Sequence, residues 1–273
     1  MIPTPISLIA CCLLGLAASA QGQIQVQTPS VFLEDLTWTE LKREVAAGKT
    51  TIIVPIGGTE QNGPHMALGK HNARVRALSE KIARELGNAL VAPVIAYVPE
   101  GSVDPPSLHM RFPGTITIPD KTFEQALESA ARGFKLHGFR DVVFLGDHGT
   151  YQKDEQAVAD RLNHEWVATS ARAHAILDYY RVTTTTYVDA LKSRGYPADE
   201  IGTHAGLADT SLTLALVPGM VRTDRLGNNA AKPAATDGVY GDPRRSSAEL
   251  GQLGVDAIVA TTVAAIRRAT ARR

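Results

Sequence analysis

The chain has 273 residues, of which 44% are hydrophobic and 21% are charged, as is ordinary for a globular protein with a sizeable core. Lys and Arg together number 28, as do Asp and Glu, and this balance argues against a nucleic acid or an anionic membrane as the main partner. Aromatic residues make up only 5%, which argues against a stacking surface for bases or sugars.

The first twenty residues form a segment of their own. Residues 1–22 carry no charged side chain, residues 6–18 are almost continuously apolar, and Ala18-Ser19-Ala20 matches an A-x-A cleavage pattern. We expect a signal peptide over residues 1–20, a flexible lead over 21–29, and export to the periplasm or the extracellular space. The apolar run is shorter than the ~20 residues that a membrane span needs. A lipoprotein anchored through Cys11 is the alternative.

Both cysteines of the chain, Cys11 and Cys12, lie inside this predicted signal peptide. A mature chain without them has no thiol for disulfides, for nucleophilic attack or for metal binding. Any metal must then be held by His, Asp and Glu side chains.

In the rest of the chain, segments with the pattern of strands alternate with segments that have the periodicity of helices. The predicted elements, in chain order, are a helix over 36–48, a strand over 51–56, a helix over 72–87, a strand over 89–98, a helix over 122–137, a strand over 141–145, a helix over 154–169, a strand over 173–177, and helices over 186–194 and 247–269. Residues 209–216 form a further apolar segment, and 100–120 and 220–245 are long loops. This alternation predicts an α/β fold, a single domain over residues 30–273 with a mostly parallel sheet covered by helices on both faces.

Polar clusters follow the predicted strands. Glu60 and His71 come after the strand over 51–56, His148 comes after the strand over 141–145, and His109 lies in the loop after 89–98. A later turn holds His204. Because the carboxyl ends of parallel strands meet at one edge of a sheet, these side chains can converge. A carboxylate with several imidazoles suits zinc or a similar transition metal, whereas each His taken alone fits a surface or capping role.

Four segments resemble the motifs of one known family. PIGGTEQNGPHMALGKHN at residues 55–72 is similar to the PxGSTEQHGPHLPLGTD motif of the creatininase (creatinine amidohydrolase) family. SLHMRFPGT at 107–115, GDHG at 146–149 and HAGLADTS at 204–211 resemble that family's S-x-H-x-x-FPGT, NGHG and HAG-x-x-ETS segments, in the same order. The resemblance implies a creatininase-like fold and a metal-dependent hydrolase that acts on amide C–N bonds.

The resemblance also implies a set of metal ligands. By position, Glu60, His71 and His148 correspond to ligands of dinuclear family members, but His71 stands where the family has a bridging Asp. Asn62 replaces a ligand His, and Thr150 stands where some members have an acidic ligand. Two imidazoles and one carboxylate suit one catalytic zinc, with Mn or Fe as alternatives. We therefore expect one divalent transition metal per chain, bound by Glu60, His71 and His148.

The roles of the other residues follow from the same resemblance. His204 is the expected general acid, and Asp209 is expected to orient it or to take a proton from water, so both are predicted to be catalytic. His65, His109 and Asn62 are predicted substrate contacts. The resulting hypothesis is a secreted amidohydrolase that hydrolyses a small cyclic or linear amide with a metal-activated water.

The alternative hypothesis is an exported, non-catalytic family member that binds a small molecule or a partner. Neither hypothesis involves nucleic acid or a membrane span, and both leave a homo-oligomer open.

Overall fold

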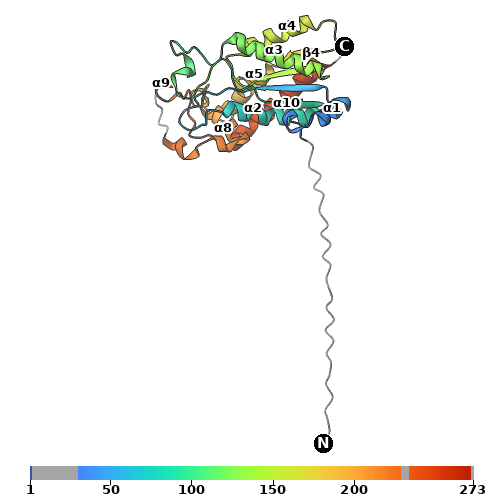
Figure 1. Ribbon diagram of the computed structural model, residues 1–273. Coiled ribbons are helices and arrows are strands. Elements are labelled where there is room, and N and C mark those ends of the chain that lie inside the picture. The colour runs from blue at the N-terminus through green and yellow to red at the C-terminus, as the bar shows by residue number, and fades with distance from the viewer. Residues whose placement is uncertain (2–29, 229–233, 272–273) are drawn as a thin grey trace.

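The computed structural model describes residues 30–228 and 234–271, besides Met1. The predicted signal peptide and the lead after it therefore lie outside the described residues, apart from Met1. The described part is a single α/β domain in which a sheet lies between two layers of helices (Figure 1).

Four parallel strands form the sheet, in the order β2-β1-β3-β4. They are β1 (Thr51–Ile56), β2 (Ala89–Val91), β3 (Asp141–Gly146) and β4 (Arg172–Ala175). β1 and β3 lie at the centre and pair along their whole length, and every residue in both strands is buried. Strands that are covered on both faces have nearly continuous apolar sequence. For this reason β1 and β3 could be predicted from the sequence. The predicted parallel sheet is confirmed.

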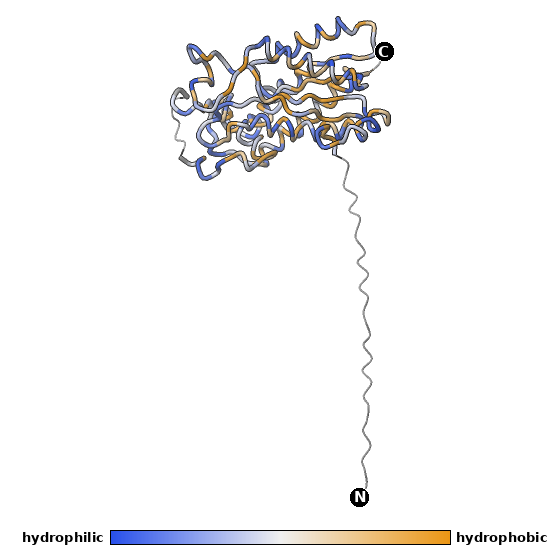
Figure 2. Tube along the Cα trace, in the orientation of Figure 1, coloured by the Kyte–Doolittle hydropathy of each residue, from blue (hydrophilic) through white to orange (hydrophobic). Residues whose placement is uncertain are grey.

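Helices cover both faces of this sheet, because alternate residues of β1 point to opposite faces. On one face Ile52, Val54 and Ile56 pack with α3 (Asp120–Leu136) and α4 (Gln152–Glu165), beside α1 (Trp38–Ala46). On the other face Ile53 packs with α2 (Lys70–Leu86), α5 (Asp178–Thr184), α6 (Thr186–Lys192), α8 (Leu207–Leu216) and α10 (Ala248–Thr270). In Figure 2 the apolar colour accordingly runs through the strands, and polar colour marks the outer parts of the helices.

Shorter elements complete the domain. They are the helices α7 (Ala198–Ile201) and α9 (Ala234–Asp237), and 3₁₀ turns at Leu33–Asp35, Leu108–Arg111, Pro218–Met220 and Thr223–Asn228.

α10 is the one helix among the described residues that is long and apolar enough to cross a membrane, with a hydropathy of 1.3 over its most apolar window. It packs against α8, α5 and α2, and 44% of that window is buried inside the domain. In Figure 1 it lies in the same helical layer as α2. α10 is therefore part of the domain's own core.

Most predicted boundaries shift by a few residues, and two of the shifts bear on the site. The strand expected over 89–98 is only Ala89–Val91, because Pro93 has no N–H with which to continue the ladder. The chain returns to β1 at Ile95, whose N–H donates to the Pro55 carbonyl at 3.0 Å. The helix expected to start near residue 72 begins at Lys70, directly after Gly69. This shift puts His71 in the first turn of α2.

The loops at the carboxyl edge of the sheet meet at one place. Ile56, the last residue of β1, pairs with Gly146, the last residue of β3, so the two segments that follow start side by side. One leads to Glu60 and the other to His148. In parallel α/β sheets this edge is where ligands bind.

Candidate metal centre and active site

The loop after β1 folds back onto the first turn of α2. Asn72 accepts a hydrogen bond from the Gly58 N–H through Oδ1 at 2.9 Å, and a Cβ atom at Gly57 would lie 2.1 Å from the same oxygen. Only glycine permits so close an approach of the backbone at residue 57. The contact brings Glu60 beside His71.

Asn62 and His65 hold this loop in place. Asn62 is fully buried, and its Nδ2 donates to the carbonyl oxygens of Glu60 at 2.9 Å and Ala67 at 3.1 Å. His65 is also fully buried, with Nε2 3.0 Å from the hydroxyl oxygen of Thr210 in α8. Neither residue lines the cavity beside the site. Asn62 and His65, both expected to contact substrate, here bond within their own loop and to α8.

Four imidazoles surround the carboxylate of Glu60, which is fully buried. Its Oε1 lies 2.7 Å from His71 Nε2 and 3.7 Å from His204 Nδ1, and its Oε2 lies 3.3 Å from His109 Nε2 and 3.5 Å from His148 Nε2. Burial raises the pKa of this carboxyl group, but His148 and His71 outweigh it and hold the pKa of Glu60 well below its usual value. The structure thus gathers one carboxylate anion and four imidazoles from segments far apart in the sequence.

His71 lies between two buried carboxylates. Its Nδ1 lies 2.6 Å from Oδ2 of Asp147, which only accepts, and 3.2 Å from Nη2 of Arg74, and the shorter contact assigns a proton to Nδ1. Its Nε2 faces Glu60 Oε1 at 2.7 Å. So short a contact needs a proton between the two atoms in the metal-free protein, and a bound metal would take the place of that proton.

His148 faces Glu60 with a lone pair. Its Nδ1 lies 2.9 Å from Oγ1 of Thr150, whose hydroxyl donates to the Pro99 carbonyl at 2.8 Å, and 3.4 Å from the Thr150 backbone nitrogen. The shorter contact assigns the proton to Nδ1, so Thr150 Oγ1 accepts it. Burial lowers the pKa of His148 to about 4, so the ring is neutral at pH 7. Its free Nε2 faces Glu60 Oε2, a buried atom without a hydrogen-bond partner among the described residues.

Gln61 gives His109 the opposite arrangement. The Gln61 amide is oriented by two contacts, because its Oε1 accepts from the Gly63 N–H at 2.9 Å and its Nε2 donates to the Gly238 carbonyl at 3.1 Å. The same Nε2 lies 2.8 Å from His109 Nδ1, which must accept. The proton of His109 is therefore on Nε2, which lies 3.3 Å from Glu60 Oε2 without forming a hydrogen bond to it.

His204 keeps a free lone pair near the same carboxylate. Its Nε2 lies 3.0 Å from the Gln61 carbonyl oxygen and donates to it, which leaves Nδ1 unprotonated. Burial, with a contribution from the charge of Lys70, lowers the pKa of His204 to about 3. His204 is therefore a neutral acceptor at pH 7.

Two groups of described residues have the spacing of a metal site. The ligand atoms of Glu60, His71 and His148 all lie within 4.8 Å of one another, and so do those of Glu60, His109 and His204. The first group is the set predicted from the sequence, with Asp147 behind His71. In the second group the His109 nitrogen nearest Glu60 carries a proton.

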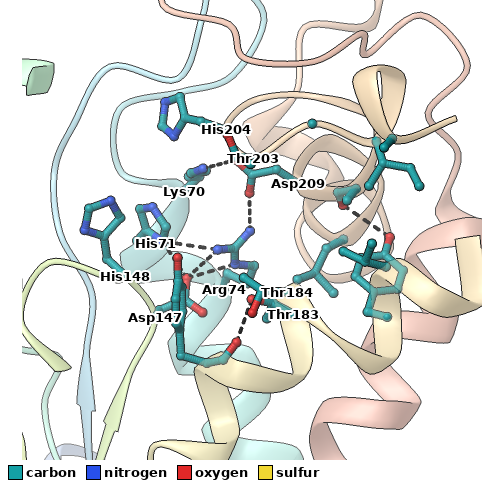
Figure 3. A pocket seen from close by; sticks show the side chains of 18 of the residues that line it. Lys70, His71, Arg74, Asp147, His148, Thr183, Thr184, Thr203, His204 and Asp209 are labelled. Carbon is teal, nitrogen blue, oxygen red and sulfur yellow. Dashed lines mark hydrogen bonds and ion pairs between the residues drawn. The ribbon is translucent and has the colours of Figure 1, made fainter. Parts of the chain in front are cut away.

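An ion-pair network lies directly beneath the site (Figure 3). Arg74 donates to Asp147 Oδ2 at 2.8 Å through Nε and to Asp209 Oδ1 at 2.6 Å through Nη1. Lys70 pairs with Asp209 Oδ2, which also accepts the Ala205 N–H at 2.9 Å. Burial opposes ionisation, but Lys70 and Arg74 hold the pKa of Asp209 well below its usual value. Asp209 is thus a permanent anion that fixes the backbone next to His204.

Glu100 is a second buried acid at the site, at the start of the long loop after β2. Its Oε2 lies 3.6 Å from His148 Nδ1, and neither of its oxygens has a hydrogen-bond partner in the described chain. Burial, helped by the charge of Glu60, raises the pKa of Glu100 to about 9. The group is therefore a neutral acid at pH 7 in the metal-free protein.

A cavity of about 460 Å³ opens beside the site. The polar part of its lining includes Lys70, His71, His148, His204 and Asp209. Further lining comes from α5 and α6, including Tyr180, Thr183 and Val188. A cavity of this size suits a small molecule.

A small molecule in this cavity meets a carboxylate and two imidazoles ready for a metal, with a neutral base beside them. That combination is the equipment of a metal-dependent hydrolase. The chain belongs to one family of such enzymes, because the family model described as creatinine amidohydrolase (creatininase) matches residues 34–266. The family resemblance noted in the sequence is confirmed.

Relatives match most of this chain. Creatinine amidohydrolase of Pseudomonas putida is 29% identical over 231 residues, which cover 80% of this chain and 85% of that protein. The 3-dehydro-scyllo-inosose hydrolase of Thermotoga maritima is 26% identical, covering 84% of this chain and 80% of that protein. A solved creatinine amidohydrolase matches with a TM-score of 0.75 and 25% identity, over 90% of this chain and 100% of that chain. Further solved creatininases are described as Zn–Zn and Mn forms.

Proposed function

We propose that this protein is an exported amidohydrolase that hydrolyses the C–N bond of a small cyclic or linear amide, with one divalent metal held by Glu60, His71 and His148. Zinc is the first choice because two imidazoles and a carboxylate are a common catalytic zinc set, and Mn or Fe are the alternatives. The observation that carries the proposal is the position of two imidazole nitrogens, His71 Nε2 at 2.7 Å and His148 Nε2 at 3.5 Å, beside the buried carboxylate of Glu60, one of whose oxygens has no hydrogen-bond partner in the described residues.

The residues around the metal position divide the chemistry among them. The metal supplies a Lewis acid that polarises the amide carbonyl and makes water more acidic. His204, neutral with a free Nδ1, takes the proton of the attacking water and returns it to the leaving nitrogen. The Nε2–H of His109 donates to the developing oxyanion. Asp209 is a positioning residue, since it holds the Ala205 N–H beside His204.

Zinc binding by variants tests whether the proposed ligands, and not other histidines, hold the metal. The metal-free mature chain is expected to take up zinc tightly in a calorimetric titration. His148→Ala is expected to lower zinc affinity by more than about 100-fold, since loss of a residue that only supports a ligand already costs about 10- to 100-fold. His164→Ala, an exposed His on α4, is the matched control and is expected to leave affinity unchanged. Failure of the natural chain to bind zinc, Mn or Fe would contradict the proposal.

Activity is tested by assaying the metal-loaded chain against small lactams, formamides and linear amides. For a substrate that it hydrolyses, His204→Asn is expected to keep the metal and to lose about 10²- to 10⁴-fold in rate, the usual contribution of a general acid–base. An unchanged rate in His204→Asn would remove His204 from the mechanism. The absence of any hydrolysis with the metal bound would favour a binding protein.

Export is supported by the uncharged apolar start of the chain and by Ala18-Ser19-Ala20. N-terminal sequencing of protein recovered outside the cytoplasm is expected to begin at Gln21. A chain that retains Met1 would contradict export by cleavage, and a lipid on Cys11 would identify a lipoprotein.

A further inference from the structure

Lys70 lies between two buried carboxylates of the site. Its side chain is 1% exposed, and its ammonium pairs with Oδ2 of Asp209 and lies 3.9 Å from Oε1 of Glu60. It is the first residue of α2, directly before the proposed ligand His71. Figure 3 shows Lys70 beside Asp209, on the same side of the site as His204.

The groups around this ammonium are those that bind a divalent cation. Glu60 Oε1 and Asp209 Oδ2 are carboxylate oxygens on either side of it. Carboxylate oxygens are ligands of zinc and manganese. The ammonium thus lies between two buried carboxylates that attract a cation.

The cations already present favour the same interpretation. Lys70 pairs with Asp209, and Arg74 pairs with both Asp147 and Asp209. A second divalent ion would have to enter beside these two buried cations, and unbalanced buried charge is costly.

We propose that the ammonium of Lys70 is the built-in second cation of this centre. It occupies the cation position between Glu60 and Asp209, and it restricts the centre to one divalent metal. This inference rests on the proposed function, because it presupposes a metal at Glu60, His71 and His148. It goes beyond that function by assigning a second cation position and the residue that fills it.

The test is to empty the position and count metals. Purified, metal-free full chains are titrated with zinc by calorimetry, and bound zinc is counted by elemental analysis after desalting. The natural chain is expected to bind one equivalent. Lys70→Ala, which removes both the charge and the side chain, is expected to bind two. Lys70→Arg, which keeps a cation, and Lys70→Met, which fills the space without a charge, are expected to bind one.

Two further measurements guard against a merely structural effect. Asp209→Asn in the Lys70→Ala background removes a ligand of the second position and is expected to restore one equivalent. In the natural chain with excess Mn(II), electron paramagnetic resonance is expected to show isolated ions, whereas Lys70→Ala is expected to show two ions coupled through Glu60.

Each outcome bears on one claim. A folded Lys70→Ala chain with one equivalent, or a natural chain with two equivalents or coupled Mn(II), overturns the inference and leaves the proposed metal site intact. If Lys70→Ala does not fold, the Mn(II) spectrum of the natural chain still decides, because isolated ions support the inference and coupled ions overturn it. A natural chain that binds no metal overturns the proposed function as well.

Discussion

His71 Nδ1 and Asp147 Oδ2 lie 2.6 Å apart in the interior of the domain. Both residues depart from the family motifs, since His71 stands in place of a bridging Asp and Asp147 in place of the first Gly of NGHG. The two departures fall on side chains in direct contact. The position of His71 thus lacks the family's carboxylate, and the carboxylate of Asp147 lies behind His71 and orients its ring.

Asp147→Asn tests this support. An amide can present its NH₂ to Nδ1 of His71 and favour the wrong tautomer, so zinc affinity is expected to fall by about 10- to 100-fold. Calorimetric titration of the metal-free chain gives the measurement. Asp141→Asn is the matched control, because Asp141 contacts His174 at 3.0 Å, away from the site, and zinc affinity is expected to stay the same. Equal affinities in both variants would show that Asp147 does not act on the metal.

Arg74→Met tests how much the ion-pair network beneath the site stabilises the protein. Arg74 is buried and bridges Asp147 and Asp209, so its loss leaves two buried carboxylates undercompensated. We expect a loss of about 3–5 kcal/mol in the free energy of unfolding, measured by urea denaturation. Arg84→Met, on the exposed face of the same helix, removes only a surface pair with Glu80 and is expected to cost less than about 1 kcal/mol. Similar losses of unfolding free energy in both variants would show that the buried ion pairs of Arg74 do not stabilise the protein more than a surface pair.

The metal-free protein is expected to lose stability on acidification at a higher pH than the titration of carboxylates alone would cause. Burial holds the pKa of His148 at about 4 and that of His204 at about 3, below the ordinary value of ~6.5. The unfolded chain therefore binds more protons than the folded chain from about pH 6.5 downward, and stability present above that pH is lost as the pH falls. Melting temperatures between pH 7.5 and 4.5 measure this.

A double variant of His148 and His204 to Gln is expected to flatten the slope over this range. His164→Ala, at an exposed position, is expected to preserve it. A natural chain that melts at the same temperature throughout would show that these two rings are not held neutral.

Glu100→Gln is expected to stabilise the metal-free protein at high pH. The pKa of Glu100 is raised to about 9, so the stability that the neutral acid provides is complete below about pH 4.5 and is lost as the pH rises toward 9. Glutamine removes that loss, and we expect a gain of about 1–3 kcal/mol in the free energy of unfolding at pH 8.5 and little change at pH 4.5. Glu85→Gln, exposed at the far end of α2, is the control. A destabilised Glu100→Gln chain at pH 8.5 would mean that Glu100 is ionised and paired.

The convergence of Glu60, His71 and His148 follows from the sequence, because buried strands alternate with helices and each candidate comes after a strand. The structure brings these three side chains to one point, as this topology requires. His109 and His204 reach the same carboxylate for the same reason. What the spacing of residues cannot give is which nitrogen of each ring is protonated, since this depends on Gln61, Thr150 and Asp147 as neighbours.

Lys70 and Arg74 are not visible in the same way. The predicted helix start near residue 72 comes from the apolar residues that follow at helical spacing, whereas the structure starts α2 after Gly69, which has no side chain to signal a cap. With the start at Lys70, the two cations fall four residues apart and face the same side of the helix. Asn62 is similar, because its amide bonds to carbonyls of its own loop, and this turn geometry has no periodic signature.

The internal hydrogen bonds of Asn62 have a consequence for how metal is taken up. They tie Glu60 to the far side of the loop through backbone carbonyls, so the loop keeps its shape whether or not an ion is present. Ordering the backbone of one residue costs about 1–2 kcal/mol of conformational entropy. Here the loop is ordered when the protein folds, so metal binding does not carry that cost. We therefore expect metal to bind to a preformed site, with little change in the heat capacity or the amide hydrogen exchange of the protein. The speed of uptake would then be set by loss of the ion's hydration water and by passage through the cavity.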